Sequence, residues 1–87
     1  MKIVDGFILK NIADTNVVVP SGSNTVSFRS IISLNESGAF LWGLLQEDTT
    51  RESLIESMLK EYDVDRETVE KDVDQFLNNM KEAGLLE

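Results

Sequence analysis

The chain has 87 residues with no cysteine and no histidine, and 16 acidic residues against 8 basic ones give it a formal charge of −8. These counts exclude a disulfide framework and thiolate or imidazole metal sites, and they remove the side chains most used for proton transfer near neutral pH. The negative charge also argues against binding to a nucleic-acid backbone.

Length and hydropathy predict one domain covering residues 1–87. No apolar run approaches the roughly 18 residues that span a bilayer, and the N-terminal residues lack the apolar region of a secretory signal. We therefore expect a soluble cytoplasmic protein with no membrane partner.

The first part of the chain has strand-like patterns. Residues 6–12 favour a first strand, a turn is expected within residues 11–16, and the β-branched residues 17–19 form a second strand that Pro20 ends. Residues 25–34 alternate most clearly, with two predicted faces: Val26, Phe28, Ser30, Ile32 and Leu34 on one, and Ser27, Arg29, Ile31 and Ser33 on the other. Three antiparallel strands would need helices against their apolar face.

A first helix is predicted directly after Leu34. Asn35 suits its N-cap, and Glu36 follows where the helix dipole favours an anion. The helix is apolar nearly all round: Leu41, Trp42 and Leu45 share one face, and Phe40 and Leu44 share another. We expect these side chains, the aromatic ones included, to form the core rather than a ligand-stacking site.

Two more helices follow. Thr49 and Glu52 have the spacing of a capping box and predict the start of the second helix, while Asp65 is the expected cap of the third. Gly84 suits the end of the third helix and leaves a short apolar tail. The apolar stripes are Leu54, Ile55, Met58, Leu59 and Tyr62 in the second helix, and Val69, Val73, Phe76, Leu77 and Met80 in the third. The order βββααα indicates a compact α+β fold.

The acidic residues around the third helix could suggest a calcium loop. Asp63, Asp65, Glu67 and Asp74 copy part of the EF-hand spacing, but Thr68 stands where that loop needs a glycine. The apolar stripe also requires a helix across the same residues. We interpret the cluster as a solvated helix face and expect no metal site.

The third strand is the best candidate for binding. Its polar side, with Ser27, Arg29 and Ser33, carries little of the charge that usually protects an edge strand from pairing. An edge strand presents free backbone N–H and C=O groups, which are either shielded or available to an extended peptide. The sequence leaves open whether this strand is an ordinary covered strand or a peptide-binding edge.

Several separated motifs resemble the PqqD family over roughly residues 7–86. These are the run 34–42 (LNESGAFLW), then residues 62–65 (YDVD), Asp72-Val73, Phe76-Leu77 and the closing residues 84–86 (GLL). The resemblance implies the winged-helix-like fold of peptide recognition elements. It also implies a non-catalytic chaperone that binds the leader of a ribosomally made precursor peptide and presents it to a modifying enzyme, often of the radical SAM class. Pyrroloquinoline quinone biosynthesis or a related pathway would be its setting.

The resemblance also implies where the leader binds, as an added strand beside the third strand and against the third helix. The implied peptide-binding residues are Ser27, Phe28, Arg29, Ser30, Ile31, Ile32, Val69, Asp72, Val73, Phe76, Asn79 and Met80. Four of the helical residues share one apolar face, so some of them must belong to the core. We expect no cofactor, and a monomer or weak homodimer.

The alternative function is a winged-helix regulatory or protein-interaction domain that binds no leader. In that case the third helix would contact a partner protein.

Overall fold

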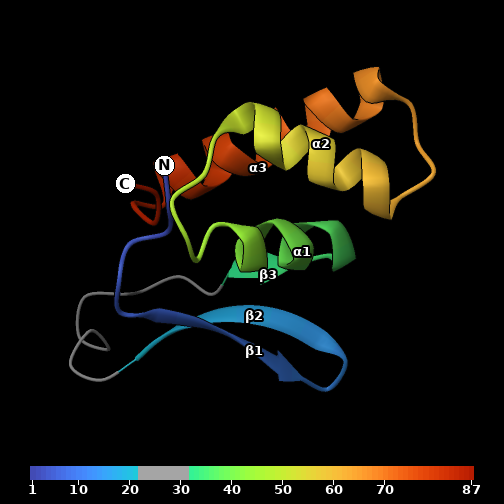
Figure 1. The fold of residues 1–87 in the computed structure, drawn as a ribbon. Coiled ribbons are helices and arrows are strands. Elements are labelled where there is room, and N and C mark those ends of the chain that lie inside the picture. The colour runs from blue at the N-terminus through green and yellow to red at the C-terminus, as the bar shows by residue number, and fades with distance from the viewer. Residues whose placement is uncertain (22–31) are drawn as a thin grey trace.

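The computed structural model describes residues 1–21 and 32–87. Its elements in chain order are β1 (Phe7–Ile12), β2 (Thr15–Pro20), β3 (Ile32–Leu34), α1 (Glu36–Leu44), α2 (Arg51–Glu61) and α3 (Arg66–Glu82) (Figure 1). The strands form an antiparallel sheet in the order β1-β2-β3. The predicted α+β fold is confirmed, whereas the part of the predicted third strand before Ile32 lies outside the described residues.

A two-residue turn joins β1 to β2. Ala13 and Asp14 have φ values of 51° and 65°, and Ile12 pairs with Thr15 across the turn. Two consecutive positive φ values are those of a type I′ turn, whose twist matches that of the strands on either side. The prediction of a turn within residues 11–16 is therefore confirmed.

Side-chain caps begin α1 and α3 as predicted. Asn35 accepts a hydrogen bond from the backbone N–H of Gly38 at 2.9 Å, and Asp65 accepts one from the backbone N–H of Thr68 at 3.2 Å. Each cap satisfies a donor in the first turn that has no partner within the helix.

The predicted capping box at the start of α2 is wrong by one residue. Thr50, not Thr49, is the N-cap, and its hydroxyl accepts a hydrogen bond from the backbone N–H of Ser53 at 3.2 Å. The two adjacent threonines offer the same chemistry, so the local sequence does not separate them. The carboxylate of Glu52, which the box would have used, pairs instead with Arg66 of α3.

The core lies where α1 is packed between the sheet and the α2–α3 pair (Figure 1). Trp42 is 4% exposed, so the expectation that it belongs to the core is confirmed. The buried cluster draws on all three helices, on the sheet and on both ends of the chain, and it comprises Ile3, Val18, Leu41, Trp42, Leu45, Leu54, Ile55, Met58, Val69, Val73, Phe76, Met80 and Leu85.

The C-terminal tail closes this core. Gly84 has a φ of 76°, and the next residue, Leu85, donates its backbone N–H to the Met80 carbonyl at 2.9 Å, as in a Schellman motif. The predicted helix end and the apolar tail are confirmed. The sequence did not predict that Ile3 would pair with Leu86 in a β-bridge. None of the helices among the described residues has the length and hydrophobicity that a membrane span requires.

Candidate functional site

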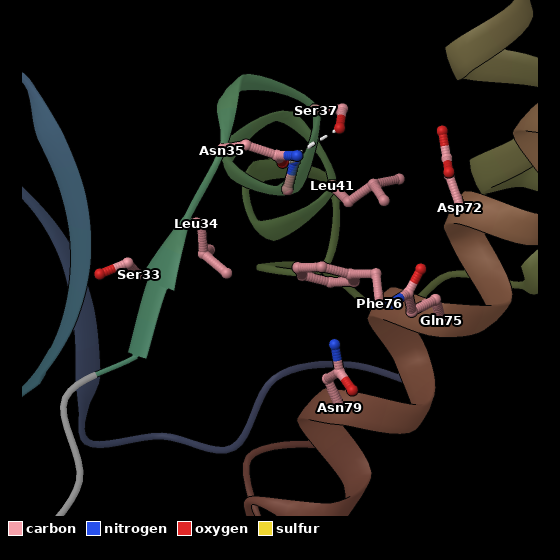
Figure 2. A pocket seen from close by; sticks show the side chains of 10 residues that line it. Ser33, Leu34, Asn35, Ser37, Leu41, Asp72, Gln75, Phe76 and Asn79 are labelled. Atoms are coloured by element: carbon pink, nitrogen blue, oxygen red, sulfur yellow. Dashed lines mark hydrogen bonds between the residues drawn. The ribbon is translucent and has the colours of Figure 1, made fainter.

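A hollow of about 350 Å³ lies between the β3–α1 junction and α3 (Figure 2). Its lining residues come from two segments: Ser33, Leu34, Asn35, Ser37, Gly38 and Leu41 from the junction, and Asp72, Gln75, Phe76 and Asn79 from α3. The α3 positions are spaced by three, one and three residues, so they share one helix face. Segments far apart in the sequence therefore form the two walls.

The base of the hollow is apolar. Figure 2 shows the Phe76 ring extending from α3 towards Leu34, with Leu41 beside it. Leu41 is 1% exposed and Phe76 is 8% exposed, while Leu34 is half-buried. Because these side chains also pack on the core, the base is a rigid surface that an apolar side chain of a ligand could contact.

The junction end of the hollow is held in place by the cap of α1. The Asn35 side-chain oxygen accepts hydrogen bonds from the Gly38 N–H at 2.9 Å and from the Ser37 hydroxyl at 3.1 Å. A Cβ atom at position 38 would lie 3.2 Å from that oxygen and 3.3 Å from the Leu34 Cβ. Glycine at position 38 therefore allows α1 to begin this close to β3.

The register of the sheet shows which backbone groups of β3 are available. A two-residue hairpin closes on a hydrogen-bonded pair, Ile12 and Thr15, and such pairs alternate along an antiparallel ladder. The same alternation makes residues 6 and 21 a hydrogen-bonded pair, and the Ser21 N–H does donate to the Gly6 carbonyl at 2.8 Å. Val17 therefore directs its backbone groups towards β1.

This alternation leaves one residue of described β3 facing outwards. Ser33 is the partner of Val17 in the β2–β3 register, so its N–H and C=O point away from β2, while those of Ile32 and Leu34 point towards it. In Figure 2 this outer edge of β3 faces α3 across the hollow. The site thus combines an outward-facing strand edge, unpaired among the described residues, with an apolar base and a polar rim.

Ion pairs hold α3 against α2. Arg51 of α2 contacts Asp74 at 2.6 Å, and its hydrogen bond lowers the pKa of that carboxyl group. Arg66 contacts Glu52 of α2, and the hydrogen bond raises the pKa of the guanidinium. None of these four residues lines the hollow, so they help to orient α3 without occupying the site.

The structure separates the helical residues that the resemblance implied. Asp72, Phe76 and Asn79 line the hollow. Val69, Val73 and Met80 are at most 1% exposed, belong to the core and do not line it.

Most of the predicted strand residues are outside the part of the chain that the structure describes. Ser27, Phe28, Arg29, Ser30 and Ile31 lie outside the described residues. Ile32 lies in β3 opposite Val18 and does not line the hollow.

Seven lining residues were not in the implied peptide-binding set: Ser33, Leu34, Asn35, Ser37, Gly38, Leu41 and Gln75. Of these, Ser33 was named only as part of the polar side of the candidate strand. Helical spacing could have indicated Gln75, which lies three residues after Asp72 and four before Asn79. No local signal indicates Leu34, Asn35, Ser37, Gly38 or Leu41, because their role depends on how closely α3 approaches the junction.

The acidic residues considered for calcium lie on or next to a continuous helix. Since α3 runs from Arg66 to Glu82, Thr68 is helical at the position where an EF-hand loop needs its sharp turn, so these residues do not form such a loop. The interpretation as a helix face is confirmed. Among the described residues, no group of acidic side chains is arranged to hold a metal ion.

Comparison with known proteins finds one matching family and two similar solved structures. The family model described as "Coenzyme PQQ synthesis protein D (PqqD)" matches residues 17–86. The solved structure of TbiB1 in complex with the TbiA(beta) leader peptide is 32% identical, with a TM-score of 0.78 over 100% of this chain and 95% of that chain. Lasso peptide synthetase B1 complexed with the leader peptide is 18% identical and has the same fold, with a TM-score of 0.71 over 97% of this chain and 93% of that chain. No curated protein matches the chain.

Proposed function

The chain belongs to the PqqD family, and from this premise we propose that it binds the leader segment of a ribosomally synthesised precursor peptide. The observation that carries the proposal is the hollow between the outward-facing edge of β3 and α3. Two similar structures, TbiB1 and lasso peptide synthetase B1, were solved with leader peptides bound, which supports the same ligand class here.

In this proposal the leader adds a strand to the sheet beside β3. The backbone of Ser33 bonds to the leader backbone, and alternate leader side chains face the hollow. Phe76 and Leu34 contact an apolar leader side chain, while Asp72 and Asn79 contact polar groups on either side of it.

The other residues of the predicted site fall into two groups, core residues of α3 and residues 27–31. Val69, Val73 and Met80 act indirectly, because their packing positions α3. Residues 27–31, which the structure does not describe, remain predicted leader-binding residues. Arg29 is predicted to contact a carboxylate of the leader.

We propose that this role is non-catalytic. The chain contains no Cys or His, and the Ser37 hydroxyl donates its hydrogen bond to the Asn35 cap rather than to a base. A small domain that holds both a substrate and an enzyme raises the local concentration of the substrate without chemistry of its own.

The partner in this proposal is a peptide-modifying enzyme. It is of the radical SAM class if the pathway makes pyrroloquinoline quinone, or of another class in a related pathway. We place the encounter in the cytoplasm, where a ribosomal precursor is made, and expect a monomer or weak homodimer.

The test is an NMR titration of the isotope-labelled protein with synthetic leaders of the precursor peptides encoded beside its gene. Micromolar binding should shift the amide signals of residues 32–34 and of the α3 face that carries Asp72, Phe76 and Asn79. A scrambled leader of the same composition is the control. If no neighbouring leader shifts these signals, leader binding is refuted and a regulatory or protein-interaction domain becomes the better reading.

A further inference from the structure

The charge distribution in the hollow is uneven. Asp72 is the only charged residue among those that line the described hollow. Its carboxylate has no ion-pair partner within the described chain, whereas acidic neighbours on α3 are engaged: Glu67 with Lys71, Glu70 with Arg66 and Asp74 with Arg51. Among the described residues, the carboxylate that lines the hollow is therefore free of an ion pair and can interact with a ligand.

The position of Asp72 relative to the apolar base fits an extended peptide. Asp72 precedes Phe76 by four residues, about one helical turn of roughly 5.4 Å. Side chains at positions i and i+2 of a strand lie on the same face, roughly 6.6 Å apart. Figure 2 shows Asp72 towards the Ser37 end of the hollow, with Phe76 between it and Asn79. A leader beside β3 can thus place one side chain on Phe76 and the next side chain of that face near Asp72.

Resting on the proposed function, we propose that Asp72 makes the hollow selective for a cationic leader. The preferred leader carries a Lys or Arg two positions from the apolar residue that contacts Phe76. The nearby side chains of Asn35, Gln75 and Asn79 are neutral amides, so none of the described lining residues is a cation that would compete for the carboxylate. A leader with Asp or Glu at that position would place two negative charges together, in a protein whose formal charge is already −8.

The test measures leader affinity by fluorescence anisotropy at two salt concentrations. The probes are the synthetic leaders of the precursors encoded beside the gene, and copies in which each Lys or Arg is changed to Gln. The protein variants are Asp72→Asn and the matched control Asp63→Asn, which removes the same charge from an exposed residue outside the hollow.

We expect Asp72→Asn to raise the leader Kd about three- to tenfold and to reduce its salt dependence, as for a charge pair that the bound peptide partly covers. Asp63→Asn should change the Kd by less than about twofold. Replacing the paired leader cation should weaken binding to the unmodified protein by a similar factor. The same replacement should have little further effect on the Asp72→Asn protein, because the interaction is already lost.

Two results would overturn the inference while leaving leader binding intact. One is equal affinity of the Asp72→Asn and Asp63→Asn proteins for a leader that binds. The other is tight binding of a leader with no Lys or Arg in the segment that contacts β3. By contrast, if the unmodified protein bound none of the leaders, the proposed function itself would fail and the charge selectivity with it.

Discussion

Ser33→Pro tests strand addition directly, because the register separates the two sides of β3. The Ser33 N–H points away from β2, so proline at this position removes no hydrogen bond of the sheet. Proline is tolerated on an edge strand when its missing N–H would face outwards. We therefore expect the free energy of unfolding to change by no more than about 1 kcal/mol.

Leader binding should respond much more strongly than folding. The variant loses a backbone donor worth about 0.5–1.5 kcal/mol, and its ring occupies space that the added strand would need. A total loss of about 1–2 kcal/mol corresponds to a roughly 5- to 30-fold increase in the Kd.

Two further proline variants serve as controls. Asn11→Pro places proline at an outward-facing position of β1, the opposite edge of the sheet, and should leave the Kd unchanged. Ile32→Pro removes an N–H that faces β2 and should destabilise the fold. Leader anisotropy and urea unfolding of all three variants provide the required measurements.

Strand addition at Ser33 makes a prediction that can fail. If the Ser33→Pro protein were folded and bound the leader as tightly as the unmodified protein, the leader would not add to this edge of β3. Weaker binding by Asn11→Pro alone would instead indicate the β1 edge.

Three other predictions follow from the structure. Phe76→Ala should lower the free energy of unfolding by about 3 kcal/mol or more, since the ring is buried, and should weaken leader binding; urea unfolding and anisotropy test this, and an unchanged midpoint would contradict the assigned packing. Gly84→Ala should lower the free energy of unfolding by about 1 kcal/mol, because position 84 has a φ of 76°, which alanine adopts with strain. The cost should be no larger, since no atom lies close enough to clash with the added Cβ. A melting temperature equal to that of the unmodified protein would show that the helix end adapts. Asp65 accepts hydrogen bonds from the Thr68 hydroxyl and N–H, which hold the pKa of its carboxyl group below the usual 3.8. The contribution of Asp65 to the stability of the fold is therefore complete above that pH and is lost as the pH falls through the lower folded pKa. Asp65→Ala should thus be less stable than the unmodified protein at neutral pH, with the difference shrinking in acid; a gap in melting temperature that does not change with pH would rule out the carboxylate as the cause.

Local signals accounted for most element boundaries. Asn35 and Asp65 cap their helices as predicted, and Gly84 ends α3, because each acts on backbone groups within a few residues. The start of α2 was missed by one residue, because Thr49 and Thr50 are chemically equivalent. Tertiary contacts distinguish the two possibilities: the Thr49 backbone N–H donates to the Met1 carbonyl at 2.9 Å, and Glu52 pairs with Arg66 of another helix.

The candidate site was predicted less completely. The spacing of Val69, Val73, Phe76 and Met80 identified an apolar face of α3, but periodicity treats all four alike. The structure places the Phe76 ring at the edge of that face, where it lines the hollow, and buries the other three. This difference follows from the packing of α3 against α1 and the sheet, which no helical spacing encodes.

The limits set by composition, the order of elements and the helix caps were predictable from the residues alone, since they depend on residue types and on interactions between near neighbours. Long-range packing set three other features: the outward edge of Ser33 faces α3, Gly38 allows α1 to begin close to Leu34, and Asp72 is the charged residue in the described lining of the hollow. These features arise from contacts between the β3–α1 junction and a helix more than twenty residues further along the chain. Such contacts are selected by the packing of the whole core, so they become visible only when the chain is folded.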